Sequence, residues 1–299
     1  MPPSPALCRI VEPGETNETS DIYLDTNAFR YFGIAFEHVL LASEITEKIL
    51  VSPLSLFEVF AQLGDDNPAN ADLVLRQIHA VRNWTNPNHA VLLPWPDVML
   101  QMVWSQNPVQ DDDFRERMQQ SFNVILTADS LTPLKEAALQ QKQMMDDFKN
   151  TMAYDFKNML DDLKKQQGKK EGQKAKPVDT TEPWFNGVAK RAKAGASSKT
   201  IPEVQSLLGA YHEFEQSKLQ TALLIPEYNP LSHKNQNDII DSEQLIYLSD
   251  PSLCMLTADK GIKSKVVKSE QAARIVVATP EDLSDAKKAE AVVGCALGI

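Results

Sequence analysis

Hydrophobic residues near the start of the chain alternate between short apolar runs and helical spacing. Residues 22–24 are apolar and lead into the polar residues 25–27, which predicts a strand that ends in a turn. Apolar residues then recur at helical spacing over 29–48, and 49–51 form a second apolar run. Residues 52–53, Ser-Pro, are typical of a helix N-cap followed by the first helical position. The order strand, helix, strand, helix indicates a parallel α/β sheet.

The central part of the chain has a different pattern, because its apolar residues keep helical spacing from residue 65 to 226 with few strand signals. Within it, the segment 164–176 is rich in Lys, Gln and Gly and is too polar to form a core, so we expect a flexible loop. The α/β alternation then returns and predicts helix 237–248, strand 253–257, helix 259–267, strand 273–278 and helix 280–291.

These patterns together predict one α/β domain that is interrupted by a long insertion. We expect residues 21–66 and 226–299 to form the α/β domain and residues 67–225 to form a mainly helical insertion. Residues 1–20 show no periodicity and are expected to be a tail. The chain has 299 residues, of which 42% are hydrophobic, and this is enough to bury a substantial core.

Cysteine content and hydropathy bear on the compartment of the protein. The three cysteines are an odd number without CxxC spacing, so neither a disulfide framework nor a cysteine-rich zinc site is predicted, and a reducing cytoplasm is the simplest compartment. No apolar run approaches the ~18 residues that cross a bilayer, and the first residues lack the pattern of a secretory signal. We therefore expect no membrane partner.

The formal net charge of −11 argues against a nucleic-acid partner if charge is spread evenly along the chain. The distribution is uneven, because residues 164–199 hold ten Lys and Arg against three acids, and residues 260–274 hold five against one. These two basic segments are candidate phosphate-binding surfaces. The histidines lack metal-ligand spacing, and this disfavours zinc catalysis. The chain has no GxGxxG motif that would cradle a nucleotide and no GxSxG motif for serine-based acyl transfer.

Four acidic residues occupy positions where ligands gather in parallel sheets, at or just beyond the carboxyl ends of strands. Asp25 ends the first strand, Asp259 follows strand 253–257, and Asp241 is expected to open the helix before that strand. Glu58 lies on the helix after the second strand and shares a face with apolar residues, so it needs a partner or a metal ion. Mg²⁺ or Mn²⁺ would relieve the repulsion between converging carboxylates and could support phosphodiester hydrolysis.

The segments that carry these acids resemble the PIN domain of metal-dependent nucleases. They are YLDTN at residues 23–27, VSPLSLFE at 51–58, Asp241 with its apolar helix, and LTADK at 256–260. The resemblance implies a three-layer α/β/α fold, a Mg²⁺ or Mn²⁺ cofactor and cleavage of single-stranded RNA, without identifying the RNA. The metal-binding and catalytic residues that it implies are Asp25, Glu58, Asp241 and Asp259.

A second pair of acids could take the place of Asp241 and Asp259 in this site. This alternative stays open because the spacer before Asp241 is longer than in compact members of the family. Asp111 and Asp129 have the same separation as Asp241 and Asp259, and residues 123–129 repeat the strand-like pattern that ends in Thr-Ala-Asp. We favour Asp241 and Asp259, since a further strand is predicted only after the second of these pairs.

Four neighbours of the acids are candidate substrate-binding residues. Asn27 and Thr257 stand in the two strand-ending turns, where ordinary turn chemistry is the alternative role. Lys260 and Lys263 begin the second basic segment and could contact RNA phosphates.

The sequence thus predicts a metal-dependent endoribonuclease. A catalytically inactive PIN-like module that binds RNA or protein is the alternative, and a toxin-like nuclease held by an antitoxin or another protein, or a homodimer, also stays open. A phosphatase of the haloacid dehalogenase type is disfavoured, because Asn27 stands where such an enzyme needs a second Asp.

Overall fold

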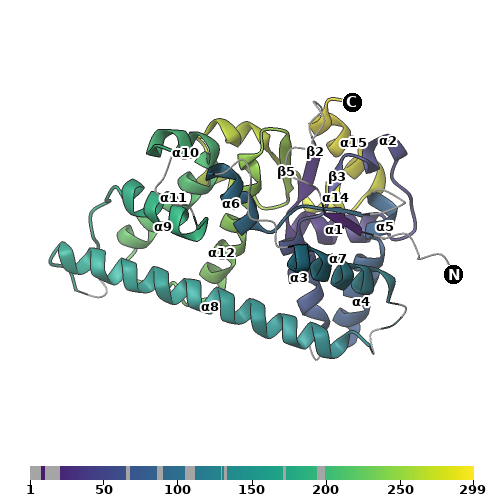
Figure 1. Ribbon diagram of the computed structural model, residues 1–299, viewed down its shortest axis with the longest axis horizontal. Coiled ribbons are helices and arrows are strands. Elements are labelled where there is room, and N and C mark those ends of the chain that lie inside the picture. The colour runs from purple at the N-terminus through teal and green to yellow at the C-terminus, as the bar shows by residue number, and fades with distance from the viewer. Residues whose placement is uncertain are drawn as a thin grey trace.

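The computed structural model of the protein has a mixed α/β fold, in which a parallel sheet carries helices on both faces (Figure 1). The structure describes residues 8–10, 21–64, 68–85, 90–104, 112–128, 130, 133–170, 173–193 and 199–299. The α/β class and the parallel sheet that the sequence predicts are confirmed.

Four short strands form the central sheet in the order β3-β2-β5-β6, and all neighbouring strands run parallel. They are β2 (Asp21–Leu24), β3 (Ile49–Leu50), β5 (Leu253–Thr257) and β6 (Ile275–Val277). Ile22 is in register with Ile49 on one side and with Cys254 on the other. Because β2 and β5 are parallel neighbours, the residues that follow them, Asp25 and Asp259, come to the same edge of the sheet.

A second pair of strands lies beyond β3. Strand β1 (Cys8–Ile10) pairs in parallel with β4 (Ala90–Leu92), and an isolated bridge joins Leu92 to Val51 beside β3. The prediction of a tail is therefore wrong for residues 8–10, and the region that was predicted as a helical insertion contributes a strand. A strand of three residues is too short for its alternation to be recognised in the sequence.

Side chains of each strand alternate between two hydrophobic cores, one on each face of the sheet. Ile22 and Leu24 of β2 pack in one core with Phe29, whereas Tyr23 packs in the other core against Tyr247, with ring centroids 5.3 Å apart. The strands are buried on both faces, and this is why they read as continuous apolar runs.

Helices form most of the remaining structure. In the first part of the chain they are α1 (Thr26–Ala35), α2 (Ser43–Thr46), α3 (Pro53–Ala61) and the 3₁₀ turn η1 (Gln62–Gly64). In the central part they are α4 (Pro68–His79), α5 (Val81–Trp84), α6 (Pro96–Trp104), α7 (Asp112–Thr127), α8 (Lys135–Gln166), α9 (Thr181–Arg191), α10 (Ile201–Leu207) and α11 (Gly209–Leu224). In the last part they are α12 (His233–Leu245), η2 (Ile246–Ser249), α13 (Lys260–Lys265), η3 (Glu270–Arg274), α14 (Pro280–Leu283) and α15 (Ala286–Leu297).

One helix prediction is wrong, one is confirmed, and a strand-like alternative turns out to be helical. The single helix expected over 29–48 is instead split into α1 and α2, and residues 123–127, which have a strand-like pattern, form the last turns of α7. Helix α3 begins at Pro53 as predicted, with the Ser52 hydroxyl accepting a hydrogen bond from the backbone N–H of Ser55.

Helix α8 is the longest element of the described chain and runs along one side of the molecule (Figure 1). It packs against α3 and η1 near its beginning, against α12 in its middle and against α11 further on. It therefore bridges the two segments that carry the predicted acids. No helix among the described residues combines the length and the apolar character that crossing a membrane requires.

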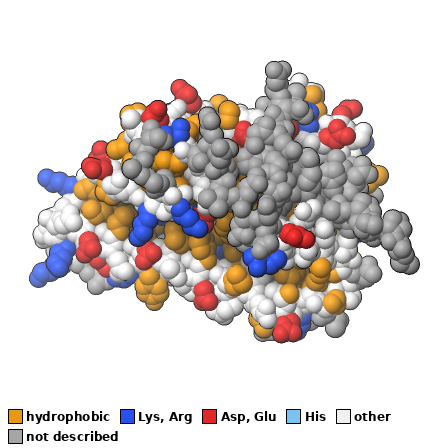
Figure 2. Space-filling model, viewed as in Figure 1, with side chains coloured by type: hydrophobic (Ala, Val, Ile, Leu, Met, Phe, Trp, Pro, Cys, Tyr) orange, Lys and Arg blue, Asp and Glu red, His pale blue; other side chains and the backbone are white. Residues whose placement is uncertain are grey.

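The basic segment 164–176 lies where α8 ends, and Figure 2 shows Lys and Arg side chains at this end of the molecule. In its described part, α8 ends at Gln166 and the residues after it form neither helix nor strand. The backbone N–H of Ala175 donates to the carbonyl of Leu223 over 2.9 Å, and the Gln167 amide pairs with both backbone groups of Lys176. Ala175 is buried against α8 and α11, so one small apolar residue anchors a segment whose overall polarity predicts a free loop.

Candidate active site

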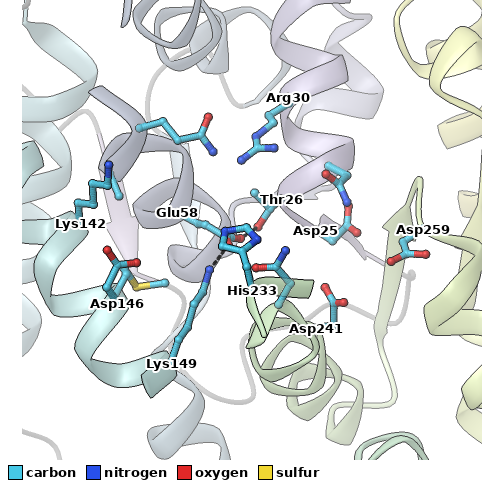
Figure 3. A pocket seen from close by; sticks show the side chains of 15 residues that line it. Asp25, Thr26, Arg30, Glu58, Lys142, Asp146, Lys149, His233, Asp241 and Asp259 are labelled. Carbon is cyan, nitrogen blue, oxygen red and sulfur yellow. Dashed lines mark hydrogen bonds and ion pairs between the residues drawn. The ribbon is translucent and has the colours of Figure 1, made fainter. Parts of the chain in front are cut away.

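All four predicted acids line one pocket with a volume of about 440 Å³ (Figure 3). Asp25 caps the N-terminus of α1 directly after β2, and Asp259 caps α13 shortly after β5. Glu58 projects from α3, and Asp241 projects from α12. Asp241 does not open its helix as predicted, because α12 already begins at His233 and places Asp241 well inside the helix.

Asp25 is the most constrained of the four acids, with only 2% of its surface exposed. Its Oδ1 accepts a hydrogen bond from the backbone N–H of Ala28 over 2.7 Å, and its Oδ2 accepts one from the Thr257 hydroxyl over 2.5 Å. The Thr257 oxygen in turn accepts from the backbone N–H of Asp259 over 2.8 Å. Thr257 thus fixes the ends of β2 and β5 relative to each other.

Burial and mutual repulsion perturb two of the carboxylates. Removal from water raises the pKa of Asp25 to about 6, with the charges of Asp259 and Glu58 adding to this and the hydrogen bonds from Thr257 and Ala28 opposing it. The pKa of Asp241 is raised well above its ordinary value, first by burial and then by the charges of Asp25 and Asp259. The site therefore gathers negative charge that its own hydrogen bonds only partly balance.

Glu58 is held differently, because both of its oxygens have partners. Oε2 accepts a hydrogen bond from the Thr26 hydroxyl over 2.6 Å, and Oε1 forms an ion pair with Lys149 of α8 at 2.7 Å. The side chains of Lys149 and Glu58 are 13% and 19% exposed, so this pair is largely shielded from water. A residue of the helical insertion thus neutralises one of the predicted acids.

Replacing Lys149 by Met is expected to lower the free energy of unfolding by about 1–3 kcal/mol, since it leaves the Glu58 carboxylate without its charged partner. Urea unfolding of Lys149→Met, Glu58→Gln and the double variant measures the coupling between the two side chains. Lys288→Met, which removes an exposed lysine 3.8 Å from Asp282, is the control and should change stability by less than about 0.5 kcal/mol. Additive effects of the first two substitutions would contradict the pairing.

The candidate substrate-binding residues have different positions. Asn27 lines the pocket. Thr257 is fully buried and holds Asp25, so its role as a substrate contact is corrected to that of a positioning residue. Lys260 is exposed and is not among the residues that line the pocket. Lys263 turns away, because its ammonium group donates to the backbone carbonyls of Ala272 and Ile275.

Sequence reasoning missed the other charged residues of the pocket. They are Arg30 of α1, Lys142, Asp146 and Lys149 of α8, and His233 of α12. The three residues of α8 follow the i, i+4, i+7 spacing of one helix face, which is the sequence pattern that could have grouped them. The spacing does not indicate which part of the protein that helix face packs against.

No described residue of the first basic segment, 164–199, lines the pocket. Helix α8 rises by about 24 Å from Lys149 to Lys165, at about 1.5 Å per residue. Lys165, Lys169 and Lys170 are exposed at that far end. A contact between these three lysines and a bound RNA would therefore be remote from the carboxylates.

The alternative pair of acids, Asp111 and Asp129, lies outside the described residues. The strand that would have placed Asp129 beside Asp25 is absent at residues 123–127, which are helical. This removes the structural argument on which the alternative depended.

The pocket contains carboxylate oxygens, which are the type of ligand that a hard divalent cation prefers. Within the described chain, no group of three or more His, Cys, Asp or Glu side chains is placed so that it could hold a metal ion. Mg²⁺ does not require such a group, because it is usually held by one or two carboxylates and keeps several waters. Asp25, Asp241 and Asp259 supply oxygen donors, and the raised pKa values of the first two reflect a concentration of negative charge that a bound cation would relieve.

Comparison with known proteins adds no family to these observations. No protein-family model matches the chain, and neither a curated protein nor a solved structure matches it significantly.

Proposed function

We propose that the chain is a metal-dependent endoribonuclease with a PIN-like fold, which hydrolyses phosphodiester bonds of single-stranded RNA. The observation that carries the proposal is the meeting of Asp25, Glu58, Asp241 and Asp259 in one pocket at the carboxyl edge of the sheet. These acids come from two segments of the chain that are separated by a long helical region. Helices on both faces of the parallel sheet also support the three-layer arrangement of the family.

In this proposal Asp25 and Asp259 bind Mg²⁺ or Mn²⁺ directly, and Asp241 holds waters of the ion. The bound ion would activate water for attack on phosphorus and offset the negative charge that develops there. Thr257 keeps both Asp25 and the backbone of Asp259 in place. Glu58, which is neutralised by Lys149, positions Thr26 and contributes less to the cation than the resemblance implies.

The main competing function is a PIN-like module that binds RNA or protein without cleaving it. The observation in its favour is the Glu58–Lys149 pair, which occupies one of the four acids. Growth arrest on expression of the wild type, relieved by Asp25→Ala, would support a toxin-like nuclease that a protein inhibitor holds in the cytoplasm. RNA binding without turnover would support the binding module, and a concentration-dependent mass would indicate a homodimer.

Cleavage of single-stranded RNA should require Mg²⁺ or Mn²⁺, stop with EDTA and resume when metal is restored. Thermal unfolding provides a second readout, because a cation that binds only the folded protein stabilises it. Mn²⁺ at about 100 times its Kd adds about 2.7 kcal/mol, or a rise of about 5–10 °C in Tm. The shift should be smaller near pH 5 than near pH 7.5, since protons compete for Asp25 and Asp241. An equal shift in Asp25→Asn would place the cation elsewhere.

A further inference from the structure

Arg30 is a charged residue that lines the pocket. It lies on α1, in the turn that follows Asp25, and its side chain is half-buried. Its Nε is buried and has no hydrogen-bond partner among the described residues. A buried guanidinium N–H normally has an acceptor, because leaving one unpaired costs free energy. The missing acceptor is therefore a reason to look for a ligand.

Two acids of the same pocket, Asp25 and Glu58, already have other partners. Both oxygens of Asp25 already accept hydrogen bonds from Ala28 and Thr257, and both oxygens of Glu58 are engaged by other side chains. Arg30 thus faces the same pocket as these carboxylates without being their partner. An anion that enters from solvent would complete its hydrogen bonding.

The pocket holds basic residues as well as acids. In Figure 3, Asp25, Asp241 and Asp259 lie on one side, Arg30 lies above Thr26, and Lys142 lies on the far side next to Asp146. Lys142 comes from α8, so the helical insertion supplies part of the positive charge. This arrangement suits a substrate that carries a phosphate next to a cation.

We propose that Arg30 and Lys142 form an anion subsite that binds a backbone phosphate of single-stranded RNA beside the carboxylates. The planar guanidinium can hold two phosphate oxygens at once, and the ammonium group adds charge from the opposite helix. The subsite rests on the proposed function for its substrate, but its binding chemistry does not require turnover. It also gives α8 a role, since this helix closes the pocket and supplies a phosphate contact.

Free phosphate and RNA share the chemistry that this subsite recognises. Five acids and three Lys or Arg residues line the pocket, so a small anion gains little from entering it alone. A single strand makes further contacts outside the pocket and is the favoured ligand. Competition with inorganic phosphate separates the two sources.

The test is binding of a fluorescently labelled single-stranded RNA, measured by anisotropy with Ca²⁺ in place of Mn²⁺. Arg30→Met keeps the aliphatic stem and should raise Kd at least about tenfold, with a shallower salt dependence. The Kd of Arg30→Lys should lie between those of this variant and the wild type, because lysine keeps the charge but cannot hold two phosphate oxygens at once as a guanidinium can. The matched control is Arg76→Met, which removes a surface arginine of α4 paired with Glu37 and should change Kd less than about twofold.

Several results would overturn the subsite. These are an unchanged Kd in Arg30→Met, a wild type that does not bind RNA, and displacement of RNA by stoichiometric inorganic phosphate. A Tm of Arg30→Met far below that of Arg76→Met would also count against it, since an arginine without a partner should not be needed for folding. Failure of the nuclease proposal is distinguishable: RNA would bind through Arg30 but would not be cleaved with Mn²⁺.

Discussion

Replacing Asp25 by Asn is expected to abolish metal-dependent RNA cleavage and, in the same protein, to raise the free energy of unfolding. Cleavage should fall by at least about a hundredfold, because a neutral amide cannot offset the charge of a bound cation. Stability should rise because the folded protein holds an ionised carboxylate that burial disfavours. Few substitutions at a merely structural residue would move the two properties in opposite directions.

The size and sign of the stability change follow from proton linkage. The pKa of Asp25 is about 6 in the folded protein, against an ordinary value of 3.8. The folded state therefore binds more protons between these values, so the contribution of Asp25 is fully present below about pH 4 and is lost as pH rises toward 6. About two pKa units correspond to at most about 3 kcal/mol at pH 7.5. Asn keeps the acceptor for Ala28, so the helix cap is retained.

Urea unfolding of the wild type and Asp25→Asn with EDTA, near pH 4 and pH 7.5, measures this difference. The two proteins should have similar stability at the lower pH and should diverge at the higher one. Asp21 offers a matched control, since its pKa is also raised to about 6, mainly by burial, but it lies at the opposite end of β2. Asp21→Asn should leave RNA cleavage unchanged. Wild-type cleavage by Asp25→Asn would refute the assignment of the site.

The positions of the first acids were predictable because they depend on local patterns. An apolar run that ends in Asp25 predicts a strand and a turn, and the Ser52 cap fixes where the helix of Glu58 begins. Strands β2 and β3, which precede these acids, are buried on both faces of the sheet, so their apolar runs are nearly continuous. Parallel pairing then places Asp25 and Asp259 at one edge of the sheet.

Features that depend on distant packing were not predictable. Strand β4 is recognised only through its pairing with β1 and Val51, and three residues carry too little pattern of their own. Two basic residues of the pocket, Lys142 and Lys149, come from α8, which is far in the sequence from α3, where the partner of Lys149 lies. Lys263 was instead predicted to contact RNA because of its charge, and that prediction also failed on distant packing. Its ammonium group donates hydrogen bonds to two backbone carbonyls.

A second large effect is expected at the link between the helical insertion and α12. Arg191, the last residue of α9, forms a two-pronged ion pair with Glu243 of α12, in which Nη1 donates to Oε1 over 2.6 Å. Arg191 also pairs with Asp97 of α6. Glu243 is 2% exposed, and its burial raises its pKa while Arg191 opposes that rise. The buried carboxylate therefore depends on one guanidinium for its charge balance.

Arg191→Met should lower the free energy of unfolding by about 3–5 kcal/mol at neutral pH, because it leaves a buried carboxylate without a partner. The loss should shrink as pH falls, since Glu243 then takes up a proton and no longer carries a buried charge. Adding Glu243→Gln should recover much of the stability, whereas Arg76→Met at the surface should cost less than about 1 kcal/mol. Glu243 lies two residues after Asp241, so loosening this part of α12 should also weaken the stabilisation by Mn²⁺. Urea unfolding with and without Mn²⁺ measures both effects, and a mild loss that is independent of pH would show that the ion pair does not hold α12 in place.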